Sequence, residues 1–191
     1  MPTLDLPIVA FADQGELLAW LEEHGAISEG IRIKFAKKHT GIATVSKAEA
    51  VDAALCHGWI DGQLQPLDGD YWLTRFTPRR PRSVWSEKNR ERVLELIAEG
   101  RMTPAGLTQI EAAKADGRWE RAYPRQSTAT VPDDLQAALD AHPAAAVHFA
   151  TVNAANRFAV LYRVNDAKRP ETRARRIAQL VAMLARGESL R

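Results

Sequence analysis

The four residues Leu67-Asp68-Gly69-Asp70 constrain the fold of this chain more than any other local feature. An Asp-Gly pair readily adopts the positive φ values of a type I′ turn, which joins two antiparallel strands in a hairpin. Pro66 lacks the N–H that a β-ladder needs, so we expect its strand at a sheet edge or at a bulge. Counting outward from the turn predicts three cross-strand pairs, which are Leu64 with Leu73, Gly62 with Arg75, and Asp61 with Phe76.

Patterns on both sides of this hairpin predict a small antiparallel sheet with helices packed on it. Apolar side chains alternate over residues 31–35, as in a half-buried strand, which brings the expected sheet to about three strands. Ser46 and Glu49 have the spacing of a capping box, in which each side chain bonds the other's backbone N–H at the start of a helix. The expected N-caps of the helices in this half are Asp13, Ser46, Ser86 and Thr103.

Beyond residue 120 the sequence predicts helices only. The clearest of them has an amphipathic stripe made by Ile177, Leu180, Val181 and Leu184. We therefore expect an α+β protein with a small antiparallel sheet and a helical C-terminal half. The expected organisation is an α+β region at 1–120 that contains the hairpin and a helical region at 121–191, the two packed as one globular unit.

Composition indicates an ordinary globular protein. The chain has 191 residues, of which 46% are hydrophobic, so it can bury a substantial core. Its formal net charge of +2 does not indicate a nucleic-acid protein by itself. No apolar stretch approaches the ~20 residues that span a bilayer. The N-terminus lacks the features of a signal peptide, so we expect a cytoplasmic protein.

The usual signatures of cofactor, metal and thiol chemistry are missing from the sequence. The five histidines show no i,i+4 pairing or carboxylate companion at metal-ligand spacing, and the glycines form no phosphate-binding loop. Cys56 is the single cysteine, and its neighbour His57 should point in another direction because adjacent side chains diverge on a helix or strand. We expect no cofactor, no metal site and a buried structural cysteine.

Asp61 is the one candidate for acid–base chemistry. It lies in a predicted strand, where aspartate is disfavoured, and a residue that breaks a local rule often serves a function. The favoured alternative is a structural Asp61 that pairs with an arginine or accepts hydrogen bonds from backbone amides at the sheet edge.

A cluster of arginines and large rings around the hairpin is the candidate ligand-binding surface. Guanidinium groups match phosphate or carboxylate with paired hydrogen bonds, and aromatic rings stack on bases. The alternative is a solvated arginine face beside aromatic core residues. The predicted ligand-binding set is Asp61, Arg75, Arg79, Arg80 and Trp85, and the expected ligand is anionic or a protein partner, with nucleic acid less favoured.

Five blocks of this sequence resemble the YdeI/OmpD-associated family, which is also labelled bacteriocin-protection. The resemblance extends from about Trp20 to Arg186. The blocks are ALCHGWIDG at residues 54–62, FTPRR at 76–80, SVWS at 83–86 with Asn89, MTPAG at 102–106, and AK at 167–168 with PETRARRI at 170–177.

The resemblance implies a small bacterial protein with no established enzyme activity. The family label implies resistance to bacteriocins or cationic antimicrobial peptides, together with porin association in the periplasm; the last expectation conflicts with the N-terminal sequence. Two positions differ from what the family commonly has: His57 replaces an aromatic residue, and Arg32 replaces a tryptophan. If those aromatics line a shared pocket, the pocket of this chain is more polar.

Three functional hypotheses follow. The first is a non-enzymatic binding or stress-tolerance protein that uses the hairpin and the helix after it as its contact surface. The second is an enzyme acting on an anionic small molecule, with Asp61 as acid–base and with Arg75 and Arg79 as anion clamps. The third is nucleic-acid binding by the basic hairpin.

Overall fold

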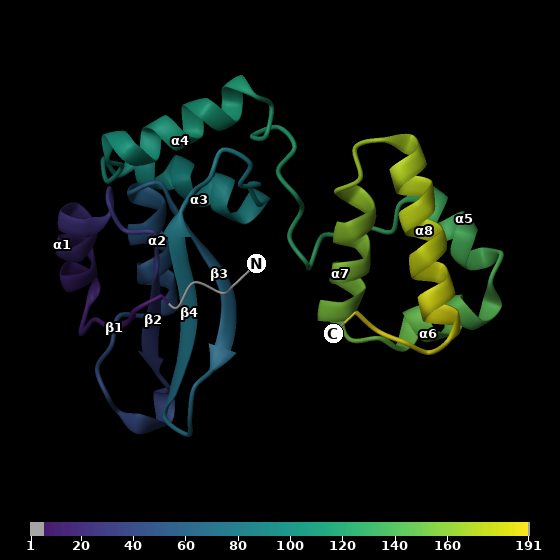
Figure 1. Ribbon diagram of the computed structural model, residues 1–191, viewed down its shortest axis with the longest axis horizontal. Coiled ribbons are helices and arrows are strands. Elements are labelled where there is room, and N and C mark those ends of the chain that lie inside the picture. Colours follow the sequence, from purple (N-terminus) through teal and green to yellow (C-terminus); the bar gives the residue numbers. More distant parts are fainter. Residues whose placement is uncertain (1–5, 191) are drawn as a thin grey trace. The chain divides into compact units, whose positions relative to one another are not determined.

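The computed structural model describes residues 6–190 and divides the chain into two compact units (Figure 1). The N-terminal unit ends at Ala122 and the C-terminal unit begins at Tyr123. The elements of the N-terminal unit are β1 (Ile8–Ala10), α1 (Gln14–His24), β2 (Ile31–Ala36), the 3-10 helix η1 (Lys38–Thr40), α2 (Lys47–Cys56), β3 (Trp59–Pro66), β4 (Tyr71–Pro78), α3 (Glu87–Ala98) and α4 (Pro104–Ala115).

These strands form a four-stranded sheet with the order β1-β2-β4-β3. Strand β1 runs parallel to β2, whereas β2 and β3 are both antiparallel to β4. The α+β class is therefore confirmed, and the expected sheet of about three strands gains a fourth. The additional strand has three residues, which are too few to show the alternation by which strands are recognised in sequence.

The hairpin is where the sequence predicts it, but its turn differs from the expected type. Neither Asp68 nor Gly69 has a positive φ, so the connection is not a type I′ turn. Instead, Asp68 Oδ1 accepts hydrogen bonds from the backbone N–H groups of Asp70 and Tyr71, each at 2.8 Å. The aspartate therefore closes the turn through its side chain, as is common in Asx turns.

The register of the hairpin matches the prediction at one end only. Asp61 is paired with Phe76 as expected, but Leu64 lies opposite Thr74 instead of Leu73. The register shifts between Asp61 and Leu64, where an irregularity typical of a β-bulge inserts an extra residue. Strand β3 lies at the edge of the sheet, where such irregularities are tolerated and where proline was expected.

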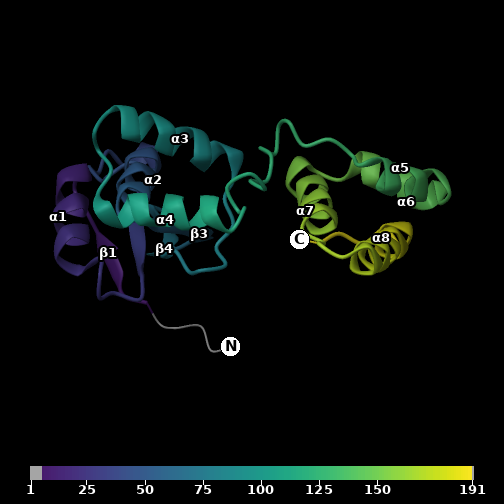
Figure 2. The ribbon, with the colours of Figure 1, turned by 90° about the horizontal axis from the view of Figure 1, so that it is seen from above.

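Helices α1 and α2 cover one face of the sheet, and Figure 2 shows no helix of the N-terminal unit on its other side. Both helices begin at the expected caps: Asp13 accepts from Glu16 N, and Ser46 and Glu49 form the predicted capping box. The core between helices and sheet is made by Phe11, Leu17, Leu21, Ile31, Ile33, Phe35, Trp59 and Phe76 with smaller neighbours.

Helices α3 and α4 enclose a second apolar cluster beside α2. They begin at Ser86 and Thr103, the two caps predicted for them. The buried members of this cluster are Leu55, Cys56, Trp85, Val93, Leu96, Ile110 and Ala113.

The C-terminal unit is helical, as expected, and has a core of its own. Its last helix buries the predicted stripe of Ile177, Leu180, Val181 and Leu184. None of the helices in the described part of the chain is both long and apolar enough to span a bilayer. The four helices are α5 (Asp133–Asp140), α6 (Pro143–Thr151), α7 (Ala154–Asn165) and α8 (Pro170–Ala185).

Candidate functional site

The structure separates two members of the predicted ligand-binding set. Asp61 is paired with Phe76, so its side chain lies on the helix-covered face of the sheet. Arg75 is the neighbour of Phe76 along β4, and its side chain therefore lies on the opposite face. An acid–base carboxylate and an anion clamp on opposite faces of one sheet do not share a ligand.

Asp61 forms an ion pair with a lysine. The structural alternative predicted from the sequence was a pair with an arginine or hydrogen bonds from backbone amides. Lys47 Nζ donates to Asp61 Oδ2 at 2.8 Å, and both side chains are about one-third exposed. The same ammonium group lies 4.5 Å from the ring centroid of Phe76. Burial lowers the pKa of Lys47, and the Asp61 carboxylate partly offsets this effect. The carboxylate is thus engaged in holding α2 to β3.

Arg75 belongs to the uncovered surface of the sheet, which we call the open face. The Arg75 side chain lies against Gly62 of β3: a Cβ on Gly62 would lie 3.1 Å from Arg75 Nε. Strand alternation places eleven residues on the open face. They are Ile8, Ala10, Arg32, Lys34, Ala36, Ile60, Gln65, Tyr71, Leu73, Arg75 and Thr77.

Three of the open-face residues are cations, and none of the eleven is acidic. Arg75 lies directly opposite Arg32 across the antiparallel ladder, so their side chains are on the same face of the sheet. Next to them, Lys34 Nζ lies 3.8 Å from the ring centroid of Tyr71. Arg75 is exposed, and Arg32 and Lys34 are half-buried. The open face is therefore a positively charged strip that solvent reaches.

Arg79 and Trp85 are brought together at the end of the hairpin. The guanidinium carbon of Arg79 lies 3.6 Å from the Trp85 ring centroid, a close cation–π contact. Arg79 Nη1 also donates to the carbonyl oxygen of Val84 at 3.3 Å. Arg79 is 6% exposed and Trp85 is 1% exposed. This pair therefore anchors the segment after β4 to the body of the unit.

Arg80 lies in an exposed turn just beyond β4. Its backbone N–H donates to Ser83 Oγ at 2.9 Å, and the backbone N–H of Ser83 donates back to the Arg80 carbonyl oxygen at 2.9 Å. The backbone of Arg80 thus has a structural function, while its side chain faces solvent.

A cavity of about 280 Å³ lies beside Arg79 within the N-terminal unit, and we call it the His57–Arg79 pocket. It forms where the ends of α1, α2 and β4 meet the start of β3 and the first turns of α4. None of the described residues that line it is an aspartate or glutamate. Its residues are Gly25, His57, Gly58, Trp59, Pro78, Arg79, Ala105, Thr108 and Gln109.

His57 is the residue of this pocket that the predicted set missed. Its Nδ1 lies 3.0 Å from the carbonyl oxygen of Ala53, one turn earlier in α2. Its Nε2 is buried and has no hydrogen-bond partner among the described residues. The one sequence clue was the replacement of an aromatic residue by histidine. Thr108 and Gln109 gave no clue, because they reach the pocket only through the packing of α4.

The described residues contain no cluster of metal ligands, and the single cysteine is buried. No group of three or more His, Cys, Asp or Glu side chains there could hold a metal ion. Cys56 is 2% exposed, and burial raises the pKa of its thiol, which favours the unreactive protonated form.

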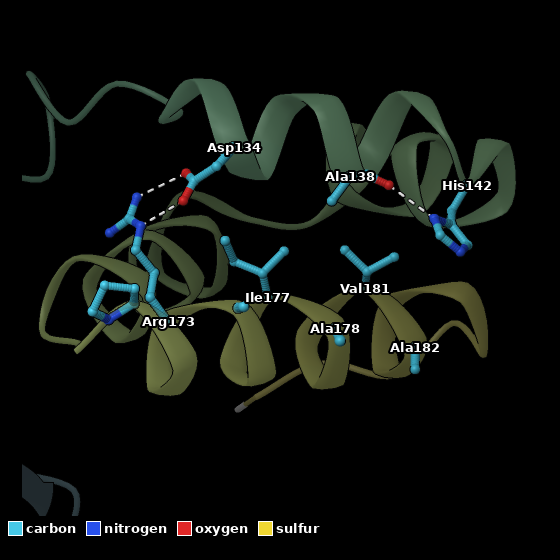
Figure 3. A pocket seen from close by; sticks show the side chains of 10 residues that line it. Asp134, Ala138, His142, Arg173, Ile177, Ala178, Val181 and Ala182 are labelled. Carbon is cyan, nitrogen blue, oxygen red and sulfur yellow. Dashed lines mark hydrogen bonds and ion pairs between the residues drawn. The ribbon is translucent and has the colours of Figure 1, made fainter. Parts of the chain in front are cut away.

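The C-terminal unit has a groove between α5 and α8, shown in Figure 3. Its volume is about 530 Å³, and Ile177 and Val181 point toward it from α8. At one end, Arg173 donates to both carboxylate oxygens of Asp134, at 2.5 and 2.8 Å. At the other end, His142 Nδ1 lies 2.9 Å from the carbonyl oxygen of Ala138. The groove is thus apolar along its floor and polar at its ends.

Two comparisons with known families describe different parts of the chain. Residues 9–109, more than half of the 191, match the family described as Domain of unknown function (DUF8412). Residues 128–187 match the family described as Bacteriocin-protection, YdeI or OmpD-Associated, so the predicted resemblance is confirmed for that segment. No curated protein and no solved structure matches the chain. The His57–Arg79 pocket and most of the open face lie within the first match.

Proposed function

The chain belongs to the DUF8412 family, and we propose that this member is a non-enzymatic binding protein whose open face holds an acidic segment of a partner protein. One observation carries this proposal. Arg75 is exposed on a sheet face that no helix of the N-terminal unit covers, Lys34 lies on the same face, and none of the eleven positions of the face is acidic.

The energetics of the open face favour an anionic partner. The positive charges of Arg75 and Lys34 are complementary to an acidic partner, which favours its association with this face. The face is a strip along neighbouring strands, so its shape suits an extended segment better than a compact small molecule. Arg80 could prolong this contact, since its exposed side chain follows the end of β4.

The aromatic content of the face favours a protein over a nucleic acid. Single-stranded nucleic acids bind through successive bases stacked on aromatic rings. Tyr71 is the one aromatic residue among the eleven, and the Lys34 ammonium group lies over its ring. The face therefore has the charge of a nucleic-acid surface without its stacking platform.

A binding function is also supported by where the candidate acid–base group lies. Asp61 accepts a hydrogen bond from Lys47 on the helix-covered face and is separated by the sheet from Arg75. The structural alternative for Asp61 is thus the better supported one. In this proposal Arg79 and Trp85 have a structural role, because they hold the end of the hairpin in place.

The decisive experiment compares two polyanions on the intact protein. Fluorescence anisotropy should show binding of labelled poly-L-glutamate that weakens as salt is added. Arg75→Glu should weaken this binding by roughly tenfold, because reversal of an exposed charge changes attraction into repulsion. Arg163→Glu makes the same change on an exposed residue of the C-terminal unit and should leave binding unchanged.

Two results would contradict the proposal. The first is an absence of poly-L-glutamate binding by the unmodified protein, or equal binding by the Arg75→Glu variant. The second is tighter binding of a single-stranded oligonucleotide of matched charge, with a steep fall as salt is added, which would assign the face to nucleic acid.

The physiological setting we propose is tolerance of bacteriocins, and the description of the family that residues 128–187 match supports it. Expression of the protein in a sensitive bacterium should raise the bacteriocin concentration needed to stop growth. If the open face is the contact surface, the Arg75→Glu variant should lose this protection while Arg163→Glu keeps it.

A further inference from the structure

The solvent side of α1 and the loop after it carry four exposed glutamates, which we call the acidic surface. They are Glu16, Glu22, Glu23 and Glu29. Residues 1–31 contain no lysine or arginine. Among the described residues, the one ionic neighbour of the acidic surface is His24, whose Nδ1 lies 3.8 Å from Glu23 Oε2. The acidic surface therefore keeps its negative charge.

Two of these glutamates lie where a negative charge is locally unfavourable. Glu22 and Glu23 are in the last turn of α1. The helix dipole places partial negative charge at that end of a helix, which favours cations there. A positively charged partner would convert this local cost into a favourable contact, and residues that break a local rule often serve a function.

The open face supplies the matching positive groups, but not within the same chain. Arg75 is exposed on that face and Lys34 lies beside it, whereas α1 packs on the opposite side of the sheet (Figure 2). The sheet therefore keeps the acidic surface of a chain away from its own open face. A second copy of the chain meets no such barrier.

Apolar side chains accompany the charges on both surfaces. Ile27, in the loop after α1, is 81% exposed, and Ile8, on the open face, is 50% exposed. Contact between the two surfaces would remove apolar area from water, which is favourable. The two surfaces thus match each other in charge and in apolar character.

We propose that the acidic surface of one protomer docks on the open face of a second copy of this chain. The inference rests on the proposed function and names the partner of the open face. Two different surfaces meet in this contact, so it is heterologous and builds a ring or an open chain of copies. Both surfaces are exposed, so the contact is weak and is lost when salt screens the charges.

Sedimentation velocity of the intact protein tests the proposal. At an ionic strength of about 0.01 M the weight-average mass should rise with protein concentration, and at about 1 M it should equal that of one chain. Arg75→Glu and Glu23→Lys should each weaken the association by at least about tenfold, because each reverses a charge on one of the two surfaces. Glu120→Lys is the matched control, since Glu120 is an exposed acid of the same unit outside both surfaces.

A mixture of the two variants gives the sharpest result. The Arg75→Glu protein keeps its acidic surface and the Glu23→Lys protein keeps its open face, so an equimolar mixture should form dimers and nothing larger. Circular dichroism reports whether each variant folds. If Glu23→Lys does not fold, Glu22→Lys replaces it, because Glu22 belongs to the same surface.

Three results would overturn the proposal: an unmodified protein that stays monomeric at low salt, association that survives either charge reversal, or a mixture of the variants that stays monomeric. Binding of poly-L-glutamate separates this failure from failure of the proposed function. A monomeric protein that still binds poly-L-glutamate through Arg75 retains the proposed function and loses only this partner, whereas a protein that binds neither loses both.

Discussion

At the scale of single residues, two glycines allow α4 to lie against the end of α2. A Cβ on Gly106 would collide with the carbonyl oxygen of Cys56, and one on Gly58 would lie 2.9 Å from the carbonyl oxygen of Ala105. Gly58 also has a φ of +75°, which other residues rarely adopt. Both collisions are with backbone atoms, so no side-chain rotation relieves them. These two positions bring Thr108 and Gln109 to the His57–Arg79 pocket.

Replacement of Gly106 by alanine should therefore destabilise the N-terminal unit. Alanine is the better helix former, yet overpacking against backbone should cost about 1–3 kcal/mol in the free energy of unfolding. Urea unfolding followed by tryptophan fluorescence measures this, because all five tryptophans precede Ala122. Gly69→Ala is the control, since a Cβ there meets nothing within 4 Å. Equal midpoints for the two variants would show that α4 can shift without cost.

At the scale of elements, an ion pair ties the start of α5 to the first turn of α8. The hydrogen bonds from Arg173 hold the pKa of the Asp134 carboxyl below its usual range. A carboxyl whose pKa is lower in the folded state stabilises the fold above its unfolded-state pKa, and this contribution disappears as the pH falls through the folded-state pKa. Asp134 is 45% exposed, so solvent screening keeps the contribution below about 1 kcal/mol.

Asp134→Asn should accordingly reduce stability at neutral pH and have little effect in acid. We expect a lower urea midpoint at pH 7 and a difference from the unmodified protein that vanishes well below pH 3.8, the ordinary pKa of aspartate. Helical circular dichroism follows the helices of both units, and tryptophan fluorescence follows the N-terminal unit alone, so a change seen only by circular dichroism belongs to the C-terminal unit, which has no tryptophan. Asp140→Asn on the same helix is the control, because Asp140 bonds the neutral side chain of Gln136. A pH-independent difference would assign the effect to packing.

At the scale of the whole molecule, the main feature is that each unit has apolar clusters of its own. The apolar cluster of the C-terminal unit is made entirely by residues after Tyr123, and those of the N-terminal unit lie before it. Each core therefore closes without side chains from the other unit. The expectation that both regions pack as one globule stays a prediction.

Separation of the chain between Ala122 and Tyr123 tests that expectation. Because its core is self-contained, the fragment 123–191 should be helical by circular dichroism and should unfold cooperatively. A small core is only marginally stable, so a lower midpoint than in the full chain is expected if the units support each other. A fragment that becomes helical only when fragment 1–122 is added would show that the two form one cooperative unit.

Sequence reasoning succeeded where local physical chemistry decides the outcome. The caps at Asp13, Ser46, Ser86 and Thr103 were predicted because a side-chain oxygen satisfies a backbone N–H only a few residues away. It failed where distant segments meet. The short strand β1 exists because β2 lies beside it, and the bulge in β3 shifts a register that counting from the turn cannot reveal.

The candidate sites illustrate the same division. Arg75, Arg79 and Trp85 stood out in sequence as a cluster of charge and rings, but Arg75 lies on the open face of β4, whereas Arg79 and Trp85 pack together beyond its end. His57 could be recognised only as an unusual residue. That it shares a pocket with residues of α4 is visible only in the folded chain.

By itself, the sequence determined the α+β class, the helix starts and the hairpin, since periodicity, capping and turn chemistry act over a few residues. Only the tertiary structure decided that Asp61 pairs with Lys47, that Arg32 opposes Arg75 on an open face, and that His57 and Arg79 share a pocket. Each of these depends on contacts between segments far apart along the chain. Such contacts depend on how all the apolar surfaces of a unit pack together into its core. A local sequence pattern does not contain that information.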